Sequence, residues 1–265
     1  MNLQPYLDFT QDLASAAAEV ILPYYGQANC GLENKDDDSP VTLADRGAEQ
    51  VMRGLIEKKF PSHGIVGEEY GFQNSDAEWV WVLDPIDGTK SFIASVPLFG
   101  TLIGLLHNGR PVVGCVNQPV LGQLLLGDNE SATLNGKKVC VRATASLSES
   151  LLLTTDPIRP HRVRDGACYD NLARQTRTVR SWGDCYGYLL VCCGWADIML
   201  DPELAAWDLL PILPCLQGAG VQVSTWQGEA IPTFDASRGG EKMFSCIAAN
   251  PTLHSQVVDI LNGCA

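Results

Sequence analysis

The 265-residue sequence lacks any apolar run that reaches the roughly 18–20 residues needed to span a lipid bilayer. Its first residues, MNLQPYLDFTQDLAS, also lack the basic segment and the apolar segment of a secretion signal. The two absences exclude a membrane-spanning protein and predict a soluble, cytoplasmic one.

The cysteines lack the CxxC spacing that is typical of zinc and dithiol sites. Most of the ten lie in apolar stretches such as LLVCCGWADIML at 189–200. Free cysteine behaves there as a small hydrophobic residue, and a reducing compartment keeps it unpaired. We therefore expect structural thiols and no metal or redox role for them.

Basic residues are scarce, with 18 Lys and Arg against 31 Asp and Glu and a formal net charge of −13. The absence of a run of Lys and Arg disfavours binding to nucleic acid or to an anionic membrane. Internal repeats and low-complexity linkers are absent too. With 46% hydrophobic residues, the chain suits one large domain or two tightly packed halves.

Hydrophobic spacing predicts two helices in the first part of the chain, at 3–25 and within 41–61, separated by a charged loop at 33–40. In the second helix Ala48, Met52 and Ile56 follow the spacing of a buried face. Thr42 followed by Asp45 resembles an N-terminal capping pair. This predicts that Asp45 lies in the first turn, away from the buried face.

Strand patterns follow. A short strand ends in the glutamates of GEE (67–69), and a strand at 80–83 delivers Asp84 into a turn. Residues 99–128 indicate a meander, and Asn135-Gly136 indicates a hairpin between 131–134 and 138–142. From about residue 145, predicted strands alternate with predicted helices, at 150–156, 159–176, 178–183, 184–196, 197–200, 207–220 and 221–225. We expect an α/β protein with an α+β half at 1–143 and an α/β half at 144–265.

The stretch DPIDGT (84–89) places two aspartates around a stiff turn. Pro85 fixes φ and has no N–H, and Gly88 permits close backbone approach. Two carboxylates, free carbonyls and amides at a helix start suit a hard divalent cation and a phosphate. A solvated Asp-Gly turn is the alternative. Taken singly, GEE also reads as solvated glutamates, and WDLLP (207–211) reads as a helix start that places Asp208 in the first turn.

Their combination is specific. GEE, DPIDGT and WDLLP in this order, with VTLAD (41–45) upstream, resemble the inositol monophosphatase family of magnesium-dependent, lithium-sensitive phosphatases. The resemblance covers essentially the whole chain. It implies a layered αβαβα sandwich, a homodimer and the hydrolysis of a small phosphate monoester.

The resemblance also implies roles for individual residues. The implied magnesium ligands are Glu68, Asp84, the Ile86 carbonyl, Asp87 and Asp208. Asp45 and Thr89, with Glu68 beside them, match the group that orients and deprotonates the attacking water. Gly88 and Thr89 match the amides that hold the phosphate. Two or three Mg²⁺ ions are expected, and Mn²⁺ suits the same oxygen ligands.

The chemistry of these residues agrees with that assignment. Carboxylates crowded into one cleft repel each other and raise each other's pKa values unless cations bind there. Bound cations invert the local charge, so a phosphate can then be held and its leaving oxygen neutralised. We therefore expect activity to depend steeply on magnesium.

The residues after the central motif bear on the substrate. Lys90-Ser91-Phe92 resembles the histidinol-phosphate phosphatase branch of the family. The positions that match the family's alcohol-binding residues, with one further candidate last, are Gly183, Asp184, Cys185, Asp201 and Arg159. Asp184 and Asp201 could bind the ammonium and imidazole of histidinol, or they could be surface carboxylates. The resemblance thus favours hydrolysis of histidinol phosphate to histidinol in histidine biosynthesis. The alternative is an inositol-1-phosphate or broad-specificity sugar or nucleotide phosphatase.

Two readings from other classes compete. The haloacid-dehalogenase phosphatases also carry an Asp-Gly-Thr, but Pro85 stands where their nucleophilic aspartate is needed, which excludes that class. A non-catalytic module that binds metal and phosphate is the second. Against it, Asp45, Thr89 and all five metal positions are present.

Overall fold

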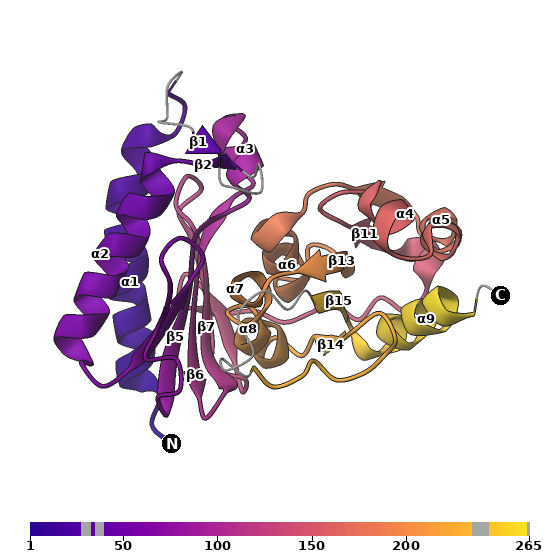
Figure 1. Cartoon of the computed structure of the whole chain (residues 1–265). Helices are drawn as coiled ribbons and strands as arrows, with labels where there is room; N and C mark the ends of the chain where they lie inside the picture. The colour runs from indigo at the N-terminus through magenta and orange to yellow at the C-terminus, as the bar shows by residue number, and fades with distance from the viewer. Residues whose placement is uncertain (28–32, 35–39, 235–243, 264–265) are drawn as a thin grey trace.

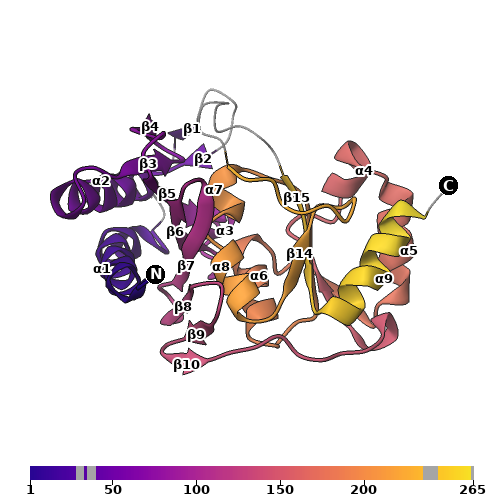
Figure 2. The ribbon, with the colours of Figure 1, turned by 90° about the horizontal axis from the view of Figure 1, so that it is seen from below.

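The computed structural model describes residues 1–27, 33–34, 40–234 and 244–263, and these residues form five stacked layers (Figures 1 and 2). The first layer holds helix α1 (Gln4–Ile21), which continues into the 3₁₀ turn η1 (Leu22–Tyr24), and helix α2 (Leu43–Lys59). On α1 the buried residues Phe9, Leu13, Ala17 and Ile21 recur every four positions. The predicted loop at 33–40 lies largely outside the described residues. Its described ends form the paired strands β1 (Glu33–Asn34) and β2 (Pro40–Val41).

The second layer is an eight-stranded sheet in the order β10-β9-β8-β7-β6-β5-β3-β4. Its strands are β3 (Gly64–Gly67), β4 (Gly71–Gln73), β5 (Trp79–Asp87), β6 (Gly100–His107), β7 (Arg110–Gln118), β8 (Gln123–Gly127), β9 (Ala132–Leu134) and β10 (Lys137–Lys138). Only β3 and β5 pair in parallel among these strands. The predicted meander and the Asn135-Gly136 hairpin are confirmed.

The third layer lies between two sheets and holds α6 (Asp184–Cys192), α7 (Ala206–Leu209) and α8 (Leu213–Gly218). The fourth is a five-stranded mixed sheet in the order β12-β11-β13-β15-β14. Its strands are β11 (Leu151–Leu153), β12 (Thr178–Arg180), β13 (Ile198–Leu204), β14 (Gln222–Ser224) and β15 (Phe244–Ala249). The outer layer holds α4 (Arg159–Val163), α5 (Gly166–Gln175) and α9 (Pro251–Asn262).

Three apolar clusters separate the layers, one under α1 and α2, one around α6 to α8, and one under α5 and α9. The predicted αβαβα sandwich is therefore confirmed. No described helix is long and apolar enough to cross a membrane. The eight cysteines that the structure describes form no disulfide with one another, and most are buried, which agrees with structural thiols.

Several element boundaries differ from the sequence-based prediction. The single helix predicted at 159–176 is two helices, because Asp165 caps a new start by accepting from the amides of Ala167 and Cys168. The helix predicted at 207–220 is also interrupted, around Pro211, where α7 ends and α8 has not begun. Strand β15 and helix α9 were not predicted.

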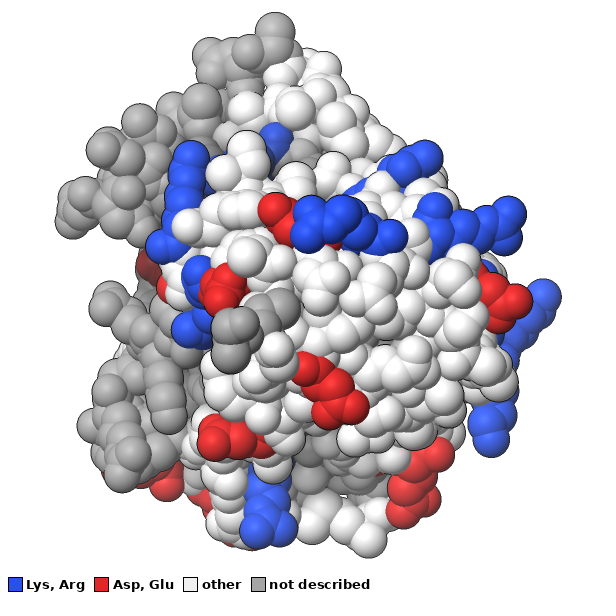
Figure 3. All heavy atoms as spheres, turned by 90° about the vertical axis from the view of Figure 1, so that its right-hand side faces the viewer, with Lys and Arg blue, Asp and Glu red and all other residues white. Residues whose placement is uncertain are grey.

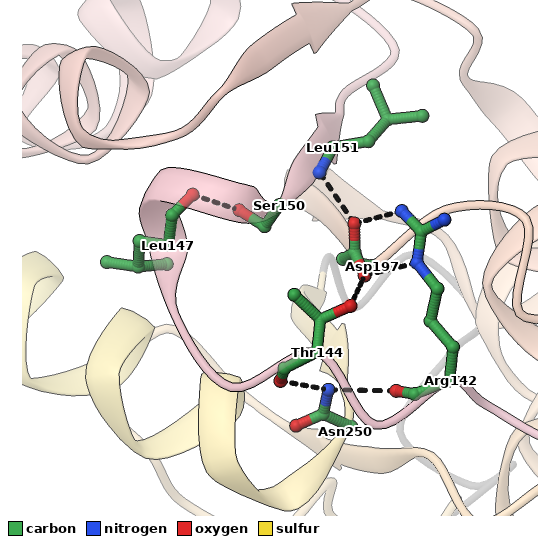
Figure 4. A network of polar contacts seen from close by, with 7 residues as sticks. All are labelled: Arg142, Thr144, Leu147, Ser150, Leu151, Asp197 and Asn250. Carbon is green, nitrogen blue, oxygen red and sulfur yellow. Dashed lines mark hydrogen bonds and ion pairs between the residues drawn. The ribbon is translucent and has the colours of Figure 1, made fainter.

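The junction between the two sheets is fixed by a buried aspartate (Figure 4). The Asp197 carboxylate accepts from the Arg142 guanidinium, from the Thr144 hydroxyl and, at 2.6 Å, from the Leu151 amide at the start of β11. Asn250 donates to the carbonyls of Arg142 and Thr144 at 3.0 and 2.9 Å. These bonds hold the segment between the two sheets, residues 139–150, against the second sheet. The first sheet ends at Lys138 and the second starts at Leu151, while the division of the chain at 143 stays a prediction.

Candidate active site

The DPIDGT stretch is a bulge at the end of strand β5 rather than a turn after it. Asp84 still pairs with Leu102 and Asp87 with Gly100, and the register shifts between them. The Thr101 hydroxyl donates to the Pro85 carbonyl at 2.9 Å and so fixes the bulge. The prediction that β5 ends before Asp84 was therefore wrong. The bulge turns both carboxylates toward the same end of the sheet.

Helix α3 (Thr89–Ile93) starts directly after this bulge, as the sequence predicted. Gly88 precedes it with φ of +86°, a left-handed conformation that disfavours residues with a Cβ atom. The Thr89 hydroxyl donates to the Ile86 carbonyl at 3.1 Å. The backbone amides at 88 and 89 thus open a short helix next to the two aspartates.

Asp45 is buried, with 1% of its surface exposed, so the prediction that it lies off the buried face was wrong. The capping box was predicted correctly: the Thr42 amide donates to Asp45 Oδ2 at 2.9 Å. The cap turns the Asp45 side chain toward the protein interior, a direction that the spacing of the hydrophobic residues does not predict. Burial raises the pKa of Asp45 to about 6, with Glu68 adding to the rise and the Thr42 hydrogen bonds opposing it.

The turn that carries Glu68 is fixed by Glu49, a residue that the sequence did not indicate. Glu49, fully buried on α2, accepts from the amides of Glu69 and Tyr70 at 2.8 and 3.1 Å. Arg53, one turn later, pairs with Glu49 at 2.7 Å. A Cβ atom at Gly67 would lie 2.0 Å from Glu49 Oε1, so this position requires glycine. One helix therefore positions both Asp45 and the turn that carries Glu68.

Three carboxylates from two distant segments meet beside this turn. Ligand oxygens of Asp84, Asp87 and Asp208 all lie within 4.8 Å of one another. Asp208 reaches them from α7, where its Oδ2 accepts from the Ala205 amide at 2.8 Å and caps the helix. The nearby carboxylates of Glu68 and Asp208 both add to the raised pKa of Asp84, which burial chiefly causes. The structure therefore brings together Asp84, Asp87 and Asp208, three of the four carboxylates that the family resemblance implied as metal ligands.

Their environment disfavours negative charge. Burial, reinforced by neighbouring carboxylates, holds the pKa values of Asp84 and Asp87 well above the usual range. Burial also raises the pKa of Asp208 to about 7. Without a cation, this cluster must therefore hold protons near neutral pH.

The donor set fits a hard divalent cation. Asp45 Oδ1 and Asp84 Oδ1 are buried, and within the described part of the chain no hydrogen-bond partner reaches either atom. Buried carboxylate oxygens are normally paired or bound to metal. Donors that are all oxygen suit Mg²⁺ or Mn²⁺ better than zinc. The described residues are thus equipped to hold a metal ion.

Two cavities open beside the cluster. One, of about 300 Å³, lies between the metal-site carboxylates and the β13–α7 region; the other, of about 480 Å³, opens over Glu68, Gly88 and Thr89. The residues that line both are Lys90, Thr155, Asp156 and Asp184. A ligand lying across these four would therefore reach from the acidic cluster toward the second sheet.

The predicted alcohol-binding residues lie in or next to these cavities. The Cys185 amide donates to the Asp87 carboxylate. Asp201, with 2% of its surface exposed, accepts from the Thr155 amide at 3.0 Å and from the Tyr188 hydroxyl at 3.1 Å. Arg159 forms an ion pair with Glu203 at the cavity wall. Thr155 and Tyr188 were not predicted, because nothing in their sequence neighbourhood marks them.

The acidity of the chain is uneven. Residues 159–180 hold six arginines against two aspartates, Asp165 and Asp170. Figure 3 shows basic side chains gathered over the upper part of the face that α5 and α9 belong to. The sequence has no continuous basic run, but this segment is locally cationic. It begins at Arg159, so positive charge borders the cavity on that side.

The raised pKa values predict how stability responds to pH. Asp45, Asp184 and Asp208 have folded-state pKa values of about 6, 7 and 7, against an ordinary value of 3.8. Since the metal-free folded protein keeps protons that the unfolded chain releases, these groups lower its stability as pH rises from about 4 to 8. Magnesium needs the ionised carboxylates, so it should raise the melting temperature far more at pH 8 than at pH 5. Thermal denaturation at both pH values, with and without MgCl₂, measures this; equal stabilisation at both would contradict it.

Comparison with known proteins agrees with the geometry. A family model described as the inositol monophosphatase family matches residues 2–263. The chain is 39% identical over 225 residues to a histidinol-phosphatase from Chlorobaculum parvum, which covers 82% of this chain and 85% of the relative. It is 38% identical over 255 residues to the chloroplastic bifunctional phosphatase IMPL2 from Arabidopsis thaliana, covering 94% of this chain and 72% of the relative.

Solved structures show the same fold. An inositol monophosphatase from Zymomonas mobilis matches with a TM-score of 0.83 at 32% identity, covering 98% of this chain and 99% of that one. The family match and the two relatives each extend over both sheets. The chain therefore belongs to the inositol monophosphatase family of phosphoric monoester hydrolases.

Proposed function

We propose that this protein is a magnesium-dependent phosphomonoesterase whose substrate is the phosphate ester of a small cationic alcohol, most simply histidinol phosphate. The observation that carries the proposal is the composition of the 300 Å³ cavity beyond the metal-site aspartates. Its acidic residues besides Asp87 and Asp208 are Asp156, Asp184, Asp201 and Glu203, and its basic residues are Lys90 and Arg159. A pocket with this excess of carboxylates favours a leaving alcohol that carries positive charge.

The metal site is proposed on the five positions named above. Magnesium held by Glu68, Asp84, the Ile86 carbonyl, Asp87 and Asp208 would supply Lewis-acid activation of the attacking water and neutralise charge at the leaving oxygen. The unpartnered Asp84 Oδ1 and the close approach of three carboxylates support this set. Manganese would suit the same oxygens.

Asp45 is the proposed acceptor of the proton from the attacking water. Its Oδ2 is fixed by Thr42, whereas its Oδ1 is left to accept a further hydrogen bond. A pKa of about 6 suits a general base that works near neutral pH. Thr89 orients the water, with its hydroxyl fixed at the Ile86 carbonyl, and the amides of Gly88 and Thr89 hold the phosphate.

The proposed reaction is hydrolysis of the phosphate ester, and water is the only other reactant. The water oxygen bonds to phosphorus, the ester P–O bond breaks, and the proton that Asp45 takes from water offsets the one that the leaving oxygen gains from solvent. The products are inorganic phosphate and the free alcohol. The named phosphatase relatives support this reaction class for the chain. A homodimer and a cytoplasmic location stay predictions.

The experiment is a comparison of kcat/KM at saturating magnesium for histidinol phosphate, myo-inositol 1-phosphate, fructose 1,6-bisphosphate and 3′-phosphoadenosine 5′-phosphate. We expect a clear preference for histidinol phosphate, the member of the set whose alcohol is cationic. A preference for inositol phosphate or a bisphosphate would overturn the substrate proposal. Failure to release phosphate from any of the four would instead favour the non-catalytic binding module.

A further inference from the structure

Asp184 holds an unusual backbone conformation at the centre of the site. Its φ is +50°, in the left-handed region that few residues other than glycine adopt. Its carboxylate lies over Gly88, with Oδ2 3.0 Å from the place where a Cβ of that glycine would be. It also lines both cavities. Strained residues at a site persist only when the surroundings hold them in place.

Thr155, in the loop between β11 and α4, fixes the backbone of Asp184 in this conformation. Its hydroxyl accepts from the Asp184 amide at 2.8 Å. Its own amide donates to Asp201 Oδ1 at 3.0 Å, and Tyr188 donates to the other oxygen of Asp201 at 3.1 Å. Both carboxylate oxygens of the buried Asp201 therefore accept hydrogen bonds from protein groups. A continuous chain of hydrogen bonds runs from Tyr188 through Asp201 and Thr155 to the backbone of Asp184.

The glycine before Asp184 makes this contact close. A Cβ atom at Gly183 would lie 2.2 Å from Thr155 Cα and 2.6 Å from Thr155 Oγ1. Gly183 therefore brings its backbone against Thr155 and leaves the neighbouring side chain to face the cavities. Both acids line the 300 Å³ cavity, but they differ: both oxygens of Asp201 accept hydrogen bonds from protein groups, whereas the side chain of Asp184 faces both cavities.

We propose that Thr155, braced by Asp201, is a positioning residue for substrate selection: it holds Asp184 in its left-handed conformation, so that the Asp184 carboxylate faces the leaving alcohol. This inference rests on the proposed phosphatase function. It gives different roles to Asp184 and Asp201, which sequence similarity alone does not distinguish. The ligand class is a phosphate ester with an ammonium or imidazolium group. Thr155 lines both cavities, but its proposed role is exerted through its hydrogen bond to the Asp184 amide.

The test measures kcat and KM for histidinol phosphate and for the neutral-alcohol ester glycerol 2-phosphate, at saturating magnesium, and takes the ratio of their kcat/KM values. Thr155→Val removes the hydroxyl at nearly constant shape and leaves the Asp184 amide unpaired, which should lower the ratio by about tenfold, chiefly through the KM of histidinol phosphate. Thr155→Ser keeps the hydroxyl and should restore the ratio. Asp184→Asn keeps a residue that tolerates the left-handed region but loses the charge, and should lower the ratio at least as much.

Thr154→Val is the matched control. Thr154 is adjacent and fully buried, and no described residue hydrogen bonds its hydroxyl, so its loss should leave the ratio unchanged and should not lower the melting temperature. The double variant Thr155→Val/Asp184→Asn should be no worse than Asp184→Asn alone, because Thr155 acts through Asp184. Calorimetric binding of histidinol itself should weaken in Thr155→Val and in Asp184→Asn.

The outcomes are distinct. Equal losses for both substrates in Thr155→Val, or an unchanged ratio, would overturn the role of Thr155 while the wild-type preference upholds the proposed function. An additive double variant would show that Thr155 does not act through Asp184 and would also overturn it. A wild-type ratio near one would overturn both the substrate proposal and this inference.

Discussion

Replacing Asp208 with asparagine should lower phosphate release by about a thousandfold, because the metal ion proposed at this site would contribute several kcal/mol to transition-state stabilisation and each 1.36 kcal/mol is tenfold in rate. Asp208 brings the α7 side of the cleft to Asp84 and Asp87. Asparagine can still accept from the Ala205 amide, so the helix cap should survive. The measurement is kcat/KM for phosphate release across magnesium concentrations, with the melting temperature of the metal-free protein beside it.

Asp165→Asn gives a matched control for that variant. Asp165 also caps a helix, by accepting from the amides of Ala167 and Cys168, but it lies outside both cavities. It should keep wild-type activity. Activity retained in Asp208→Asn would refute the assignment of this carboxylate to the metal site, and the same substitution at Asp87 should repeat the loss.

Removing the Thr89 hydroxyl should lower kcat by roughly 10²–10⁴-fold, the range for loss of a positioned proton-transfer partner. In Thr89→Ala the carboxylates that meet at the cluster are all unchanged, so the magnesium concentration for half-maximal activity should hardly move. Thr89→Ser should restore most of the rate, since it keeps the donor to the Ile86 carbonyl.

The prediction for Thr89 is tested by measuring the maximal rate and the magnesium affinity separately. It is measured by magnesium titrations of the initial rate for wild type, Thr89→Ala and Thr89→Ser, together with direct calorimetric titration of the metal. If Thr89→Ala kept its maximal rate and needed more magnesium, the residue would serve the metal rather than the water.

The central part of the site was predictable from local sequence. DPIDGT indicated two carboxylates in a stiff segment before a helix start, and WDLLP indicated a second helix start, but the bulge that keeps Asp84 and Asp87 within β5 was predicted as a turn. Their meeting in space could be inferred only from resemblance to a family. Asp45 shows the limit of periodicity: a carboxylate in a first turn counts as polar, while the cap and the packed layers bury it.

The supporting residues were out of reach of the sequence. Glu49 acts on a turn 20 residues away, and Thr155 on a helix start 29 residues away, so no local pattern marks them. The glycines offered a weak signal, since Gly67 and Gly183 are each needed for close approach of another segment. The break between α4 and α5 was visible in principle, because Asp165-Gly166 is a helix-start signal inside the longer predicted helix.

The acidic cluster is proposed to be a metal-dependent phosphatase site, so metal-free protein should be inactive. The most direct test is phosphate release from histidinol phosphate by chelator-stripped protein as MgCl₂ is added back. We expect no release above background before addition, a steep rise with magnesium, and no such rise in Asp208→Asn. Release that is undiminished in the stripped protein, or a rise that Asp208→Asn shares, would contradict it.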